Sequence, residues 1–193
     1  MRVETLTGPA LTEALDDVAK LRLAVFRDWP YLYEGDITYE RRYLEVYEQS
    51  DRAVIVAAYD GDWMVGAATA APLAEHADAF GDAFAGSGVD IDTCFYCGES
   101  VLLPRFRGRG VGHTFFDRRE AHARDLGYSQ MCFASVIRSR DHPLYPSAYR
   151  SLESFWEGRG YTRIPGVVSY FAWRDVDHGD ETEKPLQFWI RDL

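Results

Sequence analysis

The strongest constraint on the fold is residues 97–128, where an apolar strand, a glycine-rich loop and an amphipathic helix follow one another. The letters CGESVLLP predict a strand and RFRGRGVG a loop, and HTFFDRREAHARDLGY predicts a helix that ends at Gly127. Residues 130–137 (QMCFASVI) predict the next strand. A strand, a helix and a strand in this order form a βαβ crossover with two parallel strands.

The loop has the chemistry of an anion-binding cradle. Gly110 and Gly112 let main-chain N–H groups approach an anion closely, because no Cβ stands in the way. These N–H groups lie where a helix begins, so they lack partners and carry the positive end of the helix dipole. Arginines at 105, 107 and 109 add positive charge in a chain whose net charge is −10. We therefore expect the loop to bind a diphosphate.

The rest of the chain predicts an α/β protein with a mixed sheet. Helical spacing and capping signals predict helices over 9–27, from Thr38 onward, over 74–85 and over 149–158. Asp60 and Gly61 form a strong hairpin signal between two strands. The expected strands besides those above are residues 3–6, 53–59, 64–70, 167–173 and 185–190, and residues 175–184 form an acidic loop.

Length, charge and cysteine usage restrict the class of protein. The 193 residues fit a single domain, 1–193. Net acidity argues against a nucleic-acid partner. The chain has no apolar run of 18 residues and no apolar N-terminal region, so we expect no membrane partner, no secretion signal and a cytoplasmic location. Cysteines 94, 97 and 132 lack the second pair or the nearby histidine of a metal site, so we expect no metal.

Aromatic residues gather in the loop between the first two predicted helices. Trp29, Tyr31 and Tyr33 lie around Pro30 and Gly35. Such a loop either plugs the core or forms a wall of a substrate pocket, and the sequence leaves both interpretations open. We carry the three aromatics forward as candidate substrate-binding residues.

Two motifs resemble the GNAT superfamily of acyl-CoA N-acyltransferases. Residues 107–112 (RGRGVG) fit the pattern Arg/Gln-x-x-Gly-x-Gly/Ala between a strand and a helix, and residues 152–161 (LESFWEGRGY) look like the stretch that ends the family's core. The order of elements is also similar, over about residues 1–175. A P-loop is excluded because no Gly-Lys-Ser/Thr follows the glycines, and a dinucleotide fingerprint fits poorly because no glycine follows Gly112 in the helix.

The resemblance implies a fold and a reaction. The fold is a mixed, mostly antiparallel sheet with a central βαβ unit and helices on both faces. The reaction transfers an acyl group, expected to be acetyl, from acetyl-CoA to a primary amine in one ternary complex, and the expected acceptor is a small molecule more than a protein. A homodimer is a further expectation, because the family often dimerises.

The resemblance also assigns CoA-binding residues and a place for the acyl group. The CoA pyrophosphate would lie on the backbone amides of Arg107, Gly108, Arg109, Gly110, Val111 and Gly112. The pantetheine arm would pair with the backbone of Val101, Leu102 and Leu103, and a main-chain N–H near Val101 would stabilise the oxyanion. The central strand splays from its neighbour in this family, and the acyl group enters the gap.

Catalysis needs a base and benefits from an acid. An alkylamine of pKa about 10.4 is only about one part in two thousand neutral at pH 7, and Glu99 is the best candidate to remove the proton, directly or through a water. Trp156 stands where the family commonly has a tyrosine that protonates the departing thiolate, and an indole is not a usable acid. A hydroxyl from Tyr149, which stands where the family commonly has a CoA-contacting asparagine, or from Tyr145 would take that role.

Two other functions fit the same motifs. Because Trp156 replaces the expected tyrosine, the chain is also consistent with a GNAT-like module that binds CoA with little or no turnover. A protein that binds a nucleotide through the same loop is a third interpretation. Comparison of CoA with ATP and NAD as stabilising ligands separates the last interpretation from the others.

Overall fold

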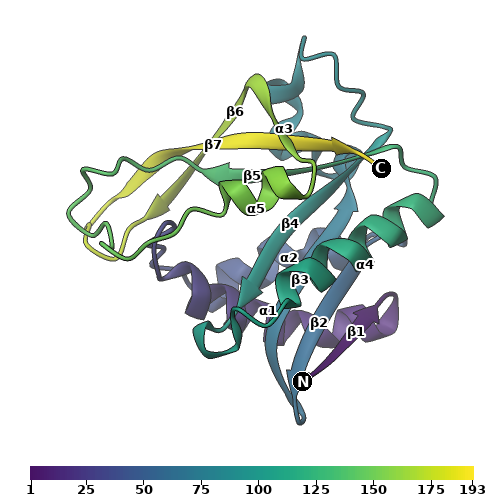
Figure 1. Cartoon of the computed structure of the whole chain (residues 1–193), viewed down its shortest axis with the longest axis horizontal. Coiled ribbons are helices and arrows are strands. Elements are labelled where there is room, and N and C mark those ends of the chain that lie inside the picture. The colour runs from purple at the N-terminus through teal and green to yellow at the C-terminus, as the bar shows by residue number, and fades with distance from the viewer.

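A sheet of seven strands forms the centre of the computed structural model, which describes residues 1–193 (Figure 1). The strands are β1 (Arg2–Leu6), β2 (Val54–Asp60), β3 (Trp63–Pro72), β4 (Cys94–Leu102), β5 (Gln130–Val136), β6 (Thr162–Arg174) and β7 (Glu181–Asp192). Their order in the sheet is β1-β2-β3-β4-β5-β7-β6, and every neighbouring pair is antiparallel except the parallel pair of β4 and β5. The prediction of a mixed, mostly antiparallel sheet is confirmed.

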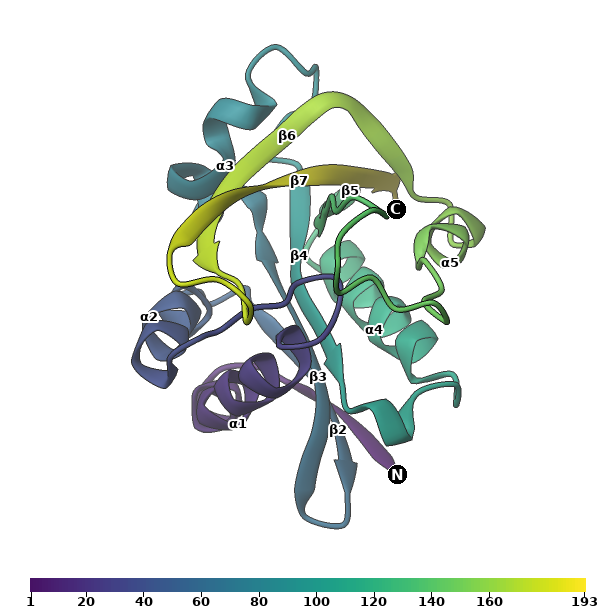
Figure 2. The same ribbon diagram turned by 90° about the vertical axis from the view of Figure 1, so that its left-hand side faces the viewer.

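Five α-helices cover the two faces of the sheet. They are α1 (Pro9–Phe26), α2 (Ile37–Glu48), α3 (Ala77–Phe84), α4 (Val111–Asp125) and α5 (Glu153–Gly158). Figure 2 shows α1, α2 and α3 on one side of the sheet and α4 and α5 on the other. The chain passes from β4 through α4 to the parallel strand β5, which is the predicted βαβ unit. None of the helices combines the length and the apolar character that a membrane span requires.

The start of α2 corrects one sequence prediction. The cap is Asp36 and not Thr38, because the Asp36 carboxylate accepts hydrogen bonds from the main-chain N–H groups of Thr38 (2.9 Å) and Tyr39 (3.1 Å). Thr38 lies inside the first turn, where its own N–H needs a partner. The cap fixes where α2 begins, and therefore where Glu40 lies in its first turn.

A β-bulge interrupts the centre of the sheet. Ala68 pairs with Ser100 and Ala70 with Cys97, so two residues of β4, Gly98 and Glu99, face the single residue Thr69 of β3. A Cβ at position 98 would lie 2.7 Å from the Thr69 hydroxyl and would overlap the Tyr47 hydroxyl, so glycine is required there. The bulge decides which way Glu99 points.

The C-terminal third differs from the predicted boundaries. Only residues 153–158 of the predicted helix 149–158 are helical, because the Ser151 hydroxyl accepts the N–H of Glu153 and starts the helix there. The predicted acidic loop shortens to residues 175–180, because Glu181 to Lys184 already pair with β6. A hairpin with one side in solvent tolerates these acidic side chains. The tyrosine at 149 therefore lies on a loop.

Candidate active site

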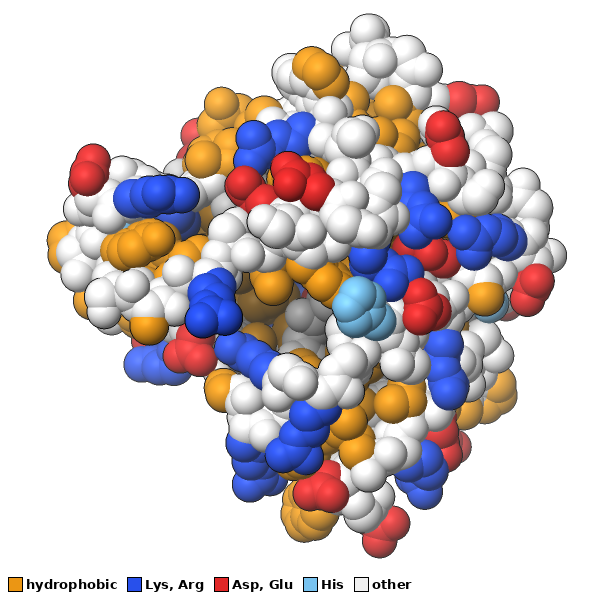
Figure 3. Space-filling model, in the orientation of Figure 1, with side chains coloured by type: hydrophobic (Ala, Val, Ile, Leu, Met, Phe, Trp, Pro, Cys, Tyr) orange, Lys and Arg blue, Asp and Glu red, His pale blue; other side chains and the backbone are white.

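The gap between β4 and β5 opens into a large cleft. The two strands pair only over Cys94–Cys97 and Gln130–Phe133, after which β5 continues along β7 as far as Val136. The resulting cleft has a volume of about 1390 Å³. Figure 3 shows a hollow on this face with basic side chains (Lys or Arg) on its rim. The splayed strands that the family resemblance implied are therefore present, and the space between them is a real cavity.

The glycine-rich loop forms one end of this cleft. Gly108 (φ 74°) and Gly110 (φ 80°) adopt left-handed backbone conformations that other residues avoid. No acceptor in the protein takes the main-chain N–H groups of residues 108–112, which lead into the first turn of α4. Five successive free donors at a helix N-terminus form a cradle for an anion.

The arginines of the loop divide into two groups. Arg107 lines the cleft, and its Nε donates to the Leu102 carbonyl at 3.0 Å. Arg109 does not line the cleft, because it donates to the Arg105 carbonyl at 3.2 Å and lies over the Phe106 ring. The positive charge at the cradle therefore comes from Arg107 and from the main chain.

The three residues predicted to pair with pantetheine face different ways. Leu102 lines the cleft, whereas Val101 and Leu103 do not. The Leu103 N–H donates to the Val65 carbonyl at 3.0 Å, and strand alternation directs the main chain of Val101 toward β3 as well. The Val101 side chain is buried among α1 and α2. The main-chain groups of β4 that face the cleft are those of Ser100 and Leu102.

Glu99 lies at the bulge, deep in the cleft wall, with 3% of its surface exposed. One carboxylate oxygen accepts from Arg22 Nη1 at 2.5 Å, and the other has no hydrogen-bond partner. Arg22 also donates through Nε to the fully buried Glu40. Burial raises the pKa of Glu99, against the opposing effect of the Arg22 guanidinium, and the Glu40 charge raises it further. Glu99 therefore has the location and the free lone pair that a base requires.

Sequence reasoning missed Arg22, Glu40 and Arg119. Arg119 is fully buried on α4, where it donates to the carbonyls of Thr69 (3.0 Å) and Glu99 (3.1 Å) and so holds the bulge. The sequence did contain a signal for Arg22, because it follows Val18 by four residues and therefore lies on the buried face of α1. A charged residue at such a position needs a partner, and the structure supplies it.

The three candidate substrate-binding aromatics do not share one wall. Trp29 and Tyr31 line the cleft, whereas Tyr33 lines a smaller cavity beside it. Arg138 holds their loop, donating to the carbonyls of Pro30 (3.0 Å) and Tyr31 (2.7 Å). The aromatic loop is therefore part of the cleft and is not only a plug of the core.

The residues considered as proton donors also line the cleft. Tyr149 and Tyr145 both line it, with their rings 5.9 Å apart, and each lies edge-on to Trp29. Burial raises the pKa of Tyr149, so it keeps its proton at neutral pH. Trp156 packs 5.0 Å from the Phe133 ring and 5.3 Å from the Trp189 ring, as part of the wall.

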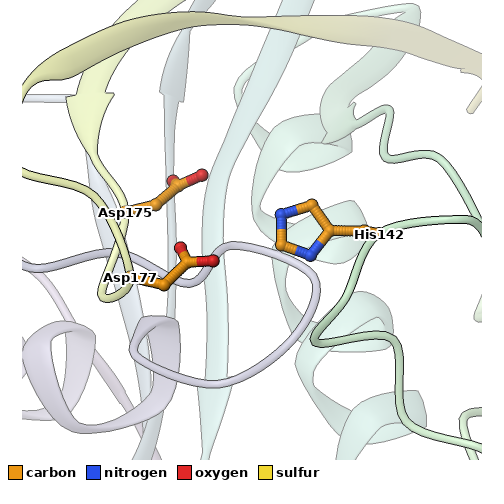
Figure 4. Close-up of side chains that lie close together, drawn as sticks. All are labelled: His142, Asp175 and Asp177. Atoms are coloured by element: carbon orange, nitrogen blue, oxygen red, sulfur yellow. The ribbon is translucent and has the colours of Figure 1, made fainter.

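One group of metal-ligating side chains lies near the aromatic loop. His142, Asp175 and Asp177 have ligand atoms within 4.8 Å of one another (Figure 4). Both oxygens of Asp175 are already bound by Arg138, at 2.6 and 2.7 Å, and Lys184 lies 3.2 Å away. These cations compensate the carboxylate, so the group works as a structural tie between the β6–β7 hairpin and the cleft. The three cysteines are buried and unpaired.

Comparison with known proteins agrees with this geometry. Residues 18–146, more than half of the chain, match the Acetyltransferase (GNAT) family. No curated protein matches the sequence. Among solved structures, an N-acetyltransferase from Staphylococcus aureus Mu50 aligns with a TM-score of 0.60 at 12% identity, covering 100% of this chain and 99% of that one.

Two further solved structures share the fold. A ribosomal-protein-alanine N-acetyltransferase from Brucella melitensis has a TM-score of 0.59 at 12% identity, with 100% of both chains covered. An aminoglycoside 6'-N-acetyltransferase complexed with coenzyme A has a TM-score of 0.57 at 17% identity, covering 100% of this chain and 97% of that one. The family match, the splayed strands and the cradle before α4 agree, and the chain belongs to the GNAT family of acetyltransferases.

Proposed function

We propose that the protein transfers an acetyl group from acetyl-CoA to the amino group of a small molecule, by direct attack in a ternary complex. The observation that carries the proposal is one continuous cleft, with free main-chain donors at one end and the buried carboxylate of Glu99 in its wall. An anion site and a base on the same cleft are the two elements that this reaction needs.

The cradle fits the pyrophosphate of CoA. The N–H groups of residues 108–112 would bind it, and Arg107 would add charge that does not titrate. Leu102 presents main-chain groups toward the cleft, where an extended pantetheine chain would run, and the N–H of Ser100 or Leu102 would face the thioester oxygen.

Two side chains, Glu99 and Tyr149, carry out the two proton transfers at the reacting groups. Glu99 accepts a proton from the attacking ammonium through its unpartnered oxygen, which makes the nitrogen nucleophilic. The nitrogen forms a bond to the thioester carbon, and the carbon–sulfur bond breaks. The amide nitrogen then releases its second proton to water, from which Tyr149 recovers the proton that it donates. Tyr149 donates its proton to the departing thiolate, a role for which its protonated state suits it. Trp156 shapes the wall and takes no part in proton transfer.

A turnover assay tests the proposal. The protein is mixed with acetyl-CoA labelled in the acetyl group and with a panel of primary amines, and acetylated amine and free thiol are both quantified. We expect equal amounts of the two products from at least one amine. Binding of CoA without transfer to any amine would refute the enzyme and favour the CoA-binding module instead. Stronger stabilisation by ATP or NAD than by CoA would refute both.

A further inference from the structure

A second cavity of about 100 Å³ adjoins the cleft on the side of α1, α2 and α3. It shares Phe26, Tyr31, Gly98 and Ala134 with the cleft, so the two spaces have a common wall at the bulge. The rest of its lining is mostly aromatic and includes Tyr33, Tyr43, Tyr96, Phe80, Phe171 and Trp173. The cavity therefore offers apolar and aromatic surface next to the position of Glu99.

The cavity contains one charged side chain, Arg22, and that charge is already compensated. Arg22 pairs with Glu40 and Glu99, and each of these carboxylates keeps one buried oxygen without a hydrogen-bond partner. One guanidinium carries a single positive charge, so it can compensate only one of these two carboxylates. A buried excess charge is unfavourable unless a further cation approaches it. Glu99 belongs to the lining of the cleft, and its unpartnered oxygen is buried directly behind that wall.

We propose that the acyl acceptor is a primary amine with a single positive charge on a compact, uncharged alkyl or aryl body, and that this body lies in the second cavity. The ammonium supplies the missing positive charge at Glu99, and the aromatic walls remove the body from water. A second charge on the body finds no counter-ion in the lining, because the lining contains no carboxylate and Arg22 is already paired. This inference rests on the proposed function and specifies its acceptor.

The size of the cavity limits the body. A dry protein cavity of about 150 Å³ holds a benzene molecule, so about 100 Å³ accommodates a group of about four carbons. Burying one methylene group contributes about 0.8 kcal/mol, which corresponds to about a fourfold change in binding. Affinity therefore rises with chain length until the cavity is full and then levels off.

The test is a ladder of n-alkylamines from ethylamine to hexylamine, with benzylamine and putrescine added. Each amine is titrated calorimetrically into the CoA-bound protein, which needs no turnover, and kcat/KM is measured separately with acetyl-CoA. We expect about a fourfold gain per methylene up to about butylamine and a plateau beyond. Putrescine should bind at least about 10²-fold more weakly than pentylamine, which has the same length and one charge fewer.

Ala172→Leu adds bulk to the cavity from an exposed position on β6. It should abolish the gain beyond ethylamine and leave the Kd of CoA unchanged. The matched control is Ala121→Leu, at an exposed position of α4 that lines neither space. An affinity that does not change along the alkylamine series, or putrescine that binds as tightly as pentylamine, would overturn the acceptor assignment even if amines are acetylated. If affinity rises along the alkylamine series but no amine is acetylated, the proposed function is refuted and the cavity assignment stands.

Discussion

Replacement of Glu99 by glutamine should remove the base while keeping the shape of the site. The side chain is 1% exposed, and glutamine retains a carbonyl oxygen for the bond to Arg22. Its amide replaces the oxygen that has no partner in the native protein. The change leaves Arg22 with one carboxylate partner, Glu40, in place of two. We therefore expect the variant to fold with a free energy of unfolding equal to or above that of the native protein.

The expected loss of activity follows from the chemistry of the amine. General-base catalysis contributes about 10²–10⁴-fold, or about 2.7–5.4 kcal/mol of barrier. The variant must use amine that is already neutral, which is about one part in two thousand at pH 7 and rises tenfold with each pH unit. The ratio of native to variant kcat/KM should therefore be about 10²–10⁴ at pH 7. It should shrink about tenfold per pH unit toward the pKa of the amine.

The assay is kcat/KM for one alkylamine between pH 6 and 10, with CoA affinity measured beside it. Glu120→Gln is the matched control, because Glu120 is also buried and paired with arginines but lies outside the cleft. We expect the control to lose stability and to keep its pH profile. A Glu99→Gln variant less than tenfold slower than the native protein at pH 7, or a ratio constant with pH, would show that another group takes the proton.

Three further predictions concern the cradle and the proton transfers. Gly110 has a left-handed backbone, so Gly110→Ala should lower the free energy of unfolding by about 1–2 kcal/mol and weaken CoA binding about ten- to hundredfold by calorimetry. The control Gly127→Ala, at a left-handed residue at the other end of α4, should have a similar cost in stability and leave CoA affinity unchanged. Burial and the Glu40 charge raise the pKa of Glu99, so kcat/KM should fall as pH drops through a value above the usual carboxyl range. Glu40→Gln removes the like charge and should move this acidic limb to lower pH. A limb that stays in place would contradict the assignment of Glu99 as the base. Tyr149→Phe should lower kcat about 10²-fold with KM unchanged in steady-state kinetics, at the low end for an acid because a thiolate is a tolerable leaving group.

The fold was largely predictable because local signals and periodic patterns agree along the chain. The βαβ unit followed from an apolar strand, a glycine loop and a helix ending at Gly127, whose φ is 87°. Errors occurred where a tertiary contact or a competing side chain decides a boundary. The helix before Gly158 is shorter than its apolar pattern suggested, because the Ser151 hydroxyl starts it late. The sequence did not predict that β7 begins in the acidic segment, because those residues are held in a strand by their pairing with β6.

The candidate site was predictable only in part. The glycines of the cradle have a local signature, since left-handed backbone at 108 and 110 requires them whatever surrounds the loop. The partners of Glu99 have none, because Arg22 and Glu40 come from two helices on one face of the sheet. The orientation of Glu99 depends on the bulge, which Arg119 holds from the opposite face.

The sequence alone determined the family, the position of the anion cradle and the candidate base, because strand period, helix period and glycine conformation are local properties of the chain. The tertiary structure decided which backbone groups face the cleft, how Glu99 is charged and where the second cavity lies. These properties arise where β4 and β5 part and where side chains distant in sequence share one buried charge, and a local pattern does not contain that information.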